Sequence, residues 1–365
     1  MAQIVIFNDM TTLAWSRSSG PYRLATELRK QGYIVQVIEF FWFNAAFAPE
    51  RVIEAIERFV GPETLLVGFS TTFIRLDASF SILGKMNLLE RFRFNQVDPN
   101  IYQNDPQTAF LNADYFSDIC GRIRARAPRV KLVIGGTRAP ATLEDRSPLD
   151  ITVHGYADQS FLRLVRYLDG KNPFFQYTAL PNGKVVLNDD VKAEGFDVNE
   201  AYIQWEDQDC LFPEEQLVIE ISRGCIFRCT FCSFPLNGKS KNDFLKHKKV
   251  LDWEFRRNYD RYGVSRYFFS DDTYNDSPEK MTYMHELLTS LPFKVKFRAY
   301  LRQDLIYAHR QEAHQLLESG LETAFFGIES LNYENLKLIG KGIRPEKTLQ
   351  NLHWLRDTVG WKEKV

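Results

Sequence analysis

The 365-residue sequence contains no apolar run long enough to cross a bilayer, and its formal net charge is only -1. The first absence excludes an ordinary membrane-spanning helix. The second leaves no global positive field that would attract nucleic acid or anionic lipid. The opening residues, MAQIVIFND, lack the basic start and apolar centre of a signal peptide and predict a strand instead. We therefore expect a cytoplasmic protein with neither a membrane nor a nucleic acid as partner.

Cysteine is scarce, with five residues in the chain, and this odd number does not suit a disulfide framework. Three of them, Cys225, Cys229 and Cys232, form the spacing C-x-x-x-C-x-x-C. This grouping indicates metal or redox chemistry in a reducing compartment. Cys120 and Cys210 lie elsewhere in the sequence and are predicted to be ordinary packing residues.

Internal repeats and low-complexity segments are also absent, whereas apolar residues make up 44% of the chain. This composition supplies enough apolar material for packed cores, so disorder is excluded as a main feature. The length suits two domains better than one core. We predict an α/β domain over residues 1–170, a connector with a small hairpin over 171–213, and a second α/β domain over 214–365.

Strand and helix patterns alternate through the first domain. Strand-like apolar runs at 3–8, 33–40, 64–70, 130–136 and 151–155 alternate with helical patterns at 20–32, 49–60, 114–126 and 158–168. Such alternation predicts a parallel sheet covered by helices on both faces. Ligands of these sheets sit at the carboxyl ends of the strands. The residues at those ends are Asn8 and Asp9, Ser70 and Thr71, Gly135, Gly136 and Thr137, and His154 and Gly155.

A second alternating pattern begins at Leu217. Its strands are predicted at 217–222, 266–271, 296–301 and 324–329, and the gaps between them are long enough for parallel crossovers. Ser277 and Pro278 are the expected N-cap and first residue of one connecting helix. The three cysteines follow the first of these strands directly.

Three soft thiolates on a tight loop can hold three irons of a cubane cluster and leave the fourth iron open. An open position suits a cluster that binds a substrate or cofactor. Arg223 and Arg228 would offset the negative charge of the thiolates, and Gly224 would let the backbone turn. Zinc is an alternative, with His247 completing a Cys₃His site. A chance grouping of buried cysteines is another.

The segment RGCIFRCTFC (223–232) resembles the signature of radical S-adenosylmethionine (SAM) enzymes. The resemblance covers residues 217–365 in order, through three further segments: YGVSRYFFSDDTYN (262–275), FRAYLRQDLI (297–306) and LLESGLETAFFGIESLNYENLKLIGKG (316–342). It implies a partial (β/α) barrel, a 4Fe-4S cluster on the three cysteines, and SAM as cofactor. One electron from the reduced cluster would cleave SAM to give a 5′-deoxyadenosyl radical, which takes hydrogen from a substrate.

The resemblance also implies roles for the residues near the signature. Phe231 would line the adenine side of SAM, and Asp271 and Asp272 would face the methionyl ammonium or the substrate. The two aspartates could instead be turn or cap residues. However, Asp276 and Ser277 are already available to start the next helix, which favours a functional role for the pair.

Further roles implied by the resemblance fall later in the chain. Arg302 would lie near the methionyl carboxylate, although it could instead pair with Asp304 at the surface. Glu329 and Ser330 would reach the ribose hydroxyls of SAM. A carboxylate at the end of an apolar strand is usually paired or functional, which supports this assignment of Glu329.

An α/β domain ahead of the cluster domain resembles the cobalamin-dependent branch of the same superfamily, with its Rossmann-like cobalamin-binding domain. The segments that carry this likeness are SGPYRLATELRKQGYIVQVIE (19–39), LLVGFSTT (65–72), VKLVIGGTRAP (130–140) and ITVHGYAD (151–158). Gly135 and Gly136 would allow close backbone approach to the ligand. The D-x-H-x-x-G element that supplies a cobalt ligand in many such domains is absent, and His154 is the only histidine here. The alternative is an inherited scaffold that binds nothing.

The resemblance implies cobalamin-assisted methylation, or another functionalisation of an unactivated carbon, on a small-molecule or peptide substrate with an external electron donor. A cobalamin-independent rearrangement, cyclisation or methylthiolation is the second interpretation. A non-catalytic zinc module that binds RNA through the lysine run at 238–249 is the third, although such a run is more often a solvated face. The second domain has four strand–helix units, fewer than the superfamily's partial barrel normally has. We therefore expect a truncated enzyme, or one completed by a partner chain, in which strand 324–329 is an unpaired edge.

Overall fold

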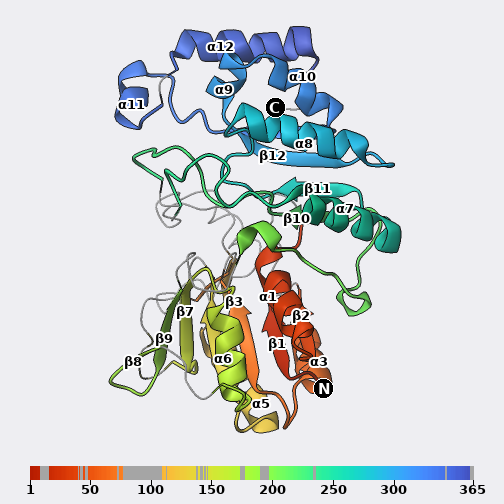
Figure 1. Ribbon diagram of the computed structural model, residues 1–365. Coiled ribbons are helices and arrows are strands. Elements are labelled where there is room, and N and C mark those ends of the chain that lie inside the picture. The colour runs from red at the N-terminus through yellow and green to blue at the C-terminus, as the bar shows by residue number, and fades with distance from the viewer. Residues whose placement is uncertain are drawn as a thin grey trace. The chain divides into compact units, whose positions relative to one another are not determined.

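The computed structural model describes residues 1–8, 16–39, 41, 44–45, 48–71, 74–76, 109–111, 113–136, 139, 143, 145, 147–172, 177–189, 197–232, 236–341 and 343–361. They form two compact units, each built on a parallel sheet (Figure 1). The first unit combines Met1–Phe196 with Gln204–Cys210, and the second combines Asp197–Ile203 with Leu211–Val365. The predicted α/β class is confirmed.

The first unit contains a seven-stranded sheet in the order β2-β1-β3-β6-β7-β9-β8. Its strands are β1 (Ile4–Phe7), β2 (Val35–Ile38), β3 (Leu66–Ser70), β6 (Lys131–Gly135), β7 (Ile151–Gly155), β8 (Thr178–Ala179) and β9 (Val185–Asp189). All pairs are parallel except β8 with β9. Because β2 and β3 flank β1, the strand order reverses there, which is where open α/β sheets bind ligands. A separate parallel pair joins β4 (Ile74–Leu76) to β5 (Ala109–Leu111).

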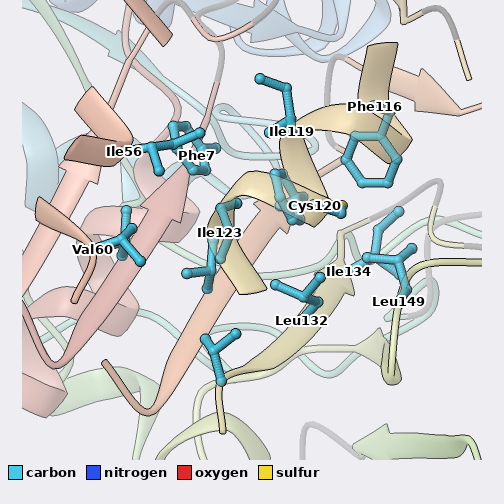
Figure 2. Packing of buried hydrophobic residues seen from close by; sticks show 14 of the residues in the cluster. Phe7, Ile56, Val60, Phe116, Ile119, Cys120, Ile123, Leu132, Ile134 and Leu149 are labelled. Carbon is cyan, nitrogen blue, oxygen red and sulfur yellow. The ribbon is translucent and has the colours of Figure 1, made fainter. Parts of the chain in front are cut away.

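Among the described residues, the helices of the first unit are α1 (Ser19–Lys30), α3 (Pro49–Phe59), α5 (Ala113–Arg126) and α6 (Ser160–Leu168). Alternate residues of the strands point to opposite faces of the sheet. One face joins Phe7 and Leu132 to residues of α3 and α5 in a single apolar cluster (Figure 2). Cys120 is fully buried in this cluster, so its predicted packing role is confirmed. Cys210 is exposed and left-handed in backbone conformation, so the same prediction for it is wrong.

The segment predicted as a connector does contain the expected hairpin, because β8 and β9 pair antiparallel around a turn at Gly183. However, β9 also pairs in parallel with β7 and so extends the first sheet. The segment 204–210, which holds the 3₁₀ turn η4 (Asp207–Asp209), belongs to the first unit as well. Pairing between strands far apart in sequence decides the boundary, and the local pattern does not show it.

The second unit contains a four-stranded parallel sheet in the order β10-β11-β12-β13. The strands are β10 (Gln216–Ile219), β11 (Arg266–Phe269), β12 (Lys296–Leu301) and β13 (Leu321–Phe326). The helices are α7 (Lys248–Tyr262), α8 (Pro278–Ser290), α9 (Gln303–Ala308), α10 (Gln311–Glu318), α11 (Tyr333–Leu338) and α12 (Pro345–Trp354), with the 3₁₀ turn η3 (Val198–Glu200) and the π turn η5 (Leu355–Val359). The Ser277 side chain accepts the backbone N–H of Lys280, so the predicted N-cap is confirmed.

The last strand starts and ends earlier than the predicted range 324–329. It begins directly after Gly320, which has a φ of +102° and lies so close to the Val295 carbonyl oxygen that a side chain would clash with it. Only glycine fits this position. β13 pairs with β12, and the described residues supply no strand on its other side, as expected for an edge. Within the described ranges, no helix is long and apolar enough to cross a membrane.

Candidate functional site

The cysteine loop leaves the carboxyl end of β10 and is held by backbone hydrogen bonds. The N–H of Cys225 donates to Leu236 at 3.3 Å, and its carbonyl accepts the N–H of Gly238 at 2.7 Å. Gly224 has a φ of +81°, and a built Cβ there would lie 2.5 Å from Cβ of Leu236. The sharp turn predicted at Gly224 is therefore present, and only glycine fits it.

The three cysteines differ in exposure. Cys225 is 8% exposed, whereas Cys229 and Cys232 are half-buried. The N–H of Cys232 donates to the Cys229 carbonyl at 3.0 Å, and Thr230 donates to the carbonyls of Leu338 and Ile339 at 3.1 and 3.3 Å. The second and third cysteines thus share one turn that is tied to the end of α11. Burial raises the pKa of the Cys225 thiol, so metal binding there has to displace a proton.

Among the described residues, no three His, Cys, Asp or Glu side chains converge closely enough to bracket a metal ion. The loop nevertheless offers the right donor set for an iron–sulfur cluster, namely three thiols with two of them open to solvent. The Cys₃His zinc alternative is not supported. His247 is the N-cap residue of α7, and its side chain is half exposed. Its Nε2 lies 3.5 Å from the carboxylate of Glu200.

Arg302 connects the cysteine loop to the end of β12. Its Nη1 lies 3.5 Å from Sγ of Cys229, and its guanidinium stacks 3.7 Å from the Phe227 ring centroid. Nε and Nη2 donate to the two carboxylate oxygens of Asp304 at 3.0 and 2.5 Å. The predicted alternative, an ion pair with Asp304, is present, but Arg302 is buried and not at the surface. The same guanidinium thus forms the ion pair with Asp304 and contacts the Cys229 thiol.

Asp271 is fully engaged within the protein. It is 1% exposed, and its oxygens accept the backbone N–H groups of Ile221 and Ser222 at 2.8 and 3.1 Å. The Ser222 hydroxyl donates to it at 2.8 Å, and the Lys280 ammonium lies 2.6 Å away. Because no carboxylate oxygen is left over, this placement argues against the cofactor contact predicted for Asp271. The residue instead fixes the chain that leads into the cysteine loop.

Asp272, the next residue, is different. It is partly buried, and no described side chain pairs with its carboxylate. Burial, followed by the negative charges of Asp271 and Glu220, raises the pKa of Asp272 to about 6. The charges of Lys280 and Lys239 offset this rise only in part, and neither ammonium pairs directly with the carboxylate. Such a carboxylate is a ready acceptor for a ligand ammonium.

The segment predicted to reach the ribose follows the end of β13. Glu329 has a φ of +67° and is exposed, and the ammonium of Lys341 lies 3.2 Å from its carboxylate. The same ammonium donates to the Gly327 carbonyl. Ser330 accepts the N–H of Asn332 at 3.0 Å. Glu329 is therefore held beyond the strand in a left-handed turn, and it does not end the strand itself.

Phe231 is 53% exposed, so its ring is free to stack against a planar ligand. The lysine run at 238–249 is not a surface of unpaired charges. Its five lysines, Lys239, Lys241, Lys246, Lys248 and Lys249, all lie within 3.7 Å of an acidic side chain. This pairing weakens the interpretation as an RNA-binding surface.

In the first unit, the predicted strand ends share one edge of the sheet, because β3, β6 and β7 are parallel neighbours. Gly135 ends β6, and its carbonyl accepts the N–H of Thr71 at 2.7 Å. Gly136 has a φ of +110°. Nε2 of His154, near the end of β7, is buried with no hydrogen-bond partner in the part of the chain that the structure describes. This edge therefore offers a backbone turn and one free imidazole nitrogen.

Four residues that contact the cysteine loop or support its neighbours were not identified from the sequence: Thr273, Asn275, Lys280 and Glu312. Asn275 accepts the backbone N–H of Arg302 at 2.8 Å and donates to its carbonyl at 3.1 Å. Glu312 is 1% exposed beside Asn275, and burial raises the pKa of its carboxyl to about 7. One signal was present in the sequence. A lysine in the first turn of α8 opposes the helix dipole, so acidic partners were to be expected.

Known proteins can now be compared with this geometry. Residues 219–361, which make up most of the second unit, match the model of the radical SAM superfamily. The chain is 26% identical, over 323 residues, to an uncharacterised methyltransferase of Pyrococcus horikoshii, covering 81% of this chain and 67% of the relative.

Two solved structures share the fold of nearly the whole chain. The cobalamin-dependent SAM radical enzyme OxsB matches 97% of this chain with a TM-score of 0.62 and 16% identity. The radical SAM methyltransferase TsrM from Kitasatospora setae matches 98% with a TM-score of 0.65 and 14% identity. The chain spans 48% of the OxsB chain and 66% of the TsrM chain. The predicted fold class, an α/β domain ahead of a radical SAM domain, is confirmed.

Proposed function

We propose that this chain is an enzyme that binds a 4Fe-4S cluster through Cys225, Cys229 and Cys232 and leaves the fourth iron to SAM. One observation carries the proposal: the three thiols directly follow β10 of a parallel sheet, inside the segment that matches the radical SAM superfamily. When bound, such a cluster supplies the electron that cleaves SAM into methionine and a 5′-deoxyadenosyl radical.

The residues around the loop bind and orient SAM in this proposal. Asp272 offers a carboxylate without a partner among the described residues to the methionyl ammonium. Arg302 offers its guanidinium to the methionyl carboxylate, and the exposed ring of Phe231 offers a stacking surface to adenine. Glu329 and Ser330 supply acceptors for the ribose hydroxyls.

We further propose that the first unit binds cobalamin along the strand ends that carry Gly135 and Gly136, and that the reaction is a methyl transfer to an unactivated carbon. The names of OxsB and TsrM and of the Pyrococcus relative support this assignment. An external electron donor, a small-molecule or peptide substrate and a cytoplasmic location belong to the same proposal, as does a partner chain beside β13. A cobalamin-independent radical reaction is the second candidate.

Cluster ligation is tested by anaerobic reconstitution with iron and sulfide. Cys229→Ala should lose the brown colour and the bound iron, whereas Cys210→Ala, an exposed cysteine of the first unit, should keep both. Equal iron content in the two variants would show that the cluster is not bound by this loop. Anaerobic titration with cobalamin separates the first candidate reaction from the second.

A further inference from the structure

A group of buried ions lies beside the cysteine loop. Lys280, in the first turn of α8, is 2% exposed. Its ammonium lies 2.6 Å from the carboxylate of Asp271 and donates to the Ser222 hydroxyl at 2.7 Å and to the Thr273 carbonyl at 3.2 Å. A second acid, Asp276, lies 3.6 Å away. All three protons of this ammonium therefore have fixed acceptors close by.

The acceptors belong to two segments that are distant in sequence. Ser222 stands three positions before Cys225, and Thr273 belongs to the loop between β11 and α8. The Thr273 hydroxyl lies 3.3 Å from Sγ of Cys225. Lys280 thus holds the Ser222 side chain on the segment that leads into the first cysteine, and also the backbone of the residue that touches its sulfur.

General stability does not explain this arrangement well. Burying a lysine costs free energy that its ion pairs offset only when the geometry is good, and apolar replacements of buried ion pairs are often neutral or stabilising. The helix dipole also disfavours a cation in the first turn. A fixed position for the neighbouring groups is what such a network of charged hydrogen bonds supplies instead.

We propose that Lys280 is a positioning residue for Cys225. Its ammonium locks Ser222 and Thr273 together, and this lock sets the direction of the Cys225 side chain and shields its sulfur. The inference rests on the proposed function for its purpose, since a cluster ligand needs a fixed direction. The protection of the Cys225 sulfur can be measured in protein that holds no cluster.

The test labels the metal-free protein with iodoacetamide and follows each cysteine by mass spectrometry. In Lys280→Met, alkylation of Cys225 should become about tenfold faster, as expected when a local contact that limits opening is lost. Two cysteines of the first unit serve as internal references, because Cys120 is buried and Cys210 is exposed. Lys248→Met is the matched control, since this ammonium pairs with Glu286 at 3.1 Å on the exposed surface of α8.

Removing one buried charge can prevent the second unit from folding, which circular dichroism and the melting temperature of the variant would show, because Cys120 reports only on the first unit. In that case the double variant Lys280→Met with Asp271→Asn decides, because it removes the Asp271 charge together with its cation, while Asp276 keeps the Lys239 ammonium at 3.7 Å. Faster labelling of Cys225 with Cys120 still protected is expected in the folded variant. Unchanged protection of Cys225 would overturn the proposal.

Reconstituted protein gives an independent reading. If wild-type protein takes up the cluster, the folded Lys280 variant should show a changed EPR spectrum or a shifted midpoint potential, whereas Lys248→Met should not. An unchanged spectrum and potential would overturn the positioning role. If wild-type protein takes up no cluster, the proposed function fails, and the labelling result still decides whether Lys280 positions Cys225.

Discussion

Nη1 of Arg302 lies 3.5 Å from Sγ of Cys229, while Nε and Nη2 of the same guanidinium are held by Asp304. Asn275 fixes the backbone of Arg302 through both its N–H and its carbonyl. A residue at the end of β12 is thereby anchored beside the second cysteine of a loop that follows β10. A fixed cation beside a thiolate stabilises the negative charge that a ligand cysteine carries.

Arg302→Lys should weaken SAM binding about tenfold, which corresponds to about 1.4 kcal/mol. Lysine keeps the charge but lacks the planar fork that grips Asp304 while a third nitrogen faces Cys229. Isothermal titration of the reconstituted protein measures the loss. Arg256→Lys is the control, because Arg256 forms a comparable pair with Asp252 on the exposed side of α7. Equal affinities in both variants would remove Arg302 from the cofactor site.

Asp272→Asn should abolish the pH dependence of SAM binding around pH 6. Burial raises the pKa of Asp272 to about 6, so the wild-type carboxylate is ionised and attracts the methionyl ammonium only above that pH. Wild-type affinity should therefore rise as the pH increases from 5 to 7, and the affinity of the variant should stay low and flat. Cluster content and melting temperature should stay nearly unchanged. A variant that binds SAM normally but melts much earlier would show that the residue is structural.

Much of the fold follows from local pattern. The run KFRAYL at 296–301 is β12 residue for residue, and the predicted helix at 114–126 is α5 with one residue added. The predicted range of β13 lies three residues too late in the sequence. The close contact between Gly320 and Val295 sets the start of this strand, and local hydrophobicity does not reveal that contact. Parallel pairing of β9 with β7 likewise depends on residues that are distant in sequence.

In the candidate site, too, local motifs could be predicted and long-range contacts could not. The three cysteines could be identified because they are neighbours in sequence, and their spacing alone indicates the chemistry. Asp271 and Asp272 look equivalent in sequence. Only the fold shows that the Asp271 carboxylate accepts hydrogen bonds from the backbone of Ile221 and Ser222. The contact between Lys280 and Ser222 joins positions 58 residues apart, so no local pattern could have predicted it.

Glu312→Gln should stabilise the protein at pH 8 and have little effect near pH 4. Burial raises the pKa of Glu312 to about 7, so the folded state holds a proton that the unfolded state releases. The wild-type free energy of unfolding should therefore fall as the pH rises from about 4.5 to about 7. The difference approaches about 3 kcal/mol, at about 1.4 kcal/mol per pH unit of pKa shift. Urea unfolding across this range measures it, and a variant that tracks the wild type at every pH would contradict the role of burial.

Cobalamin, if bound, should carry no protein histidine on cobalt. Nε2 of His154 is buried without a partner among the described residues, so His154 is the residue to examine. The EPR spectrum of bound Co(II) should lack nitrogen superhyperfine splitting, and His154→Ala should leave it unchanged. Splitting that disappears in the variant would identify His154 as a ligand. Absence of cobalamin binding under anaerobic conditions would favour the cobalamin-independent reaction.

The central claim is that Cys225, Cys229 and Cys232 hold a cluster that cleaves SAM, and one assay tests it most directly. Protein reconstituted anaerobically with iron and sulfide is reduced with dithionite, mixed with SAM, and analysed for 5′-deoxyadenosine by chromatography and mass spectrometry. We predict 5′-deoxyadenosine from wild-type protein and from Cys210→Ala, and none from an alanine variant of any of the three loop cysteines. Stoichiometric zinc in anaerobically purified protein, or 5′-deoxyadenosine formed equally well without the loop cysteines, would contradict the account.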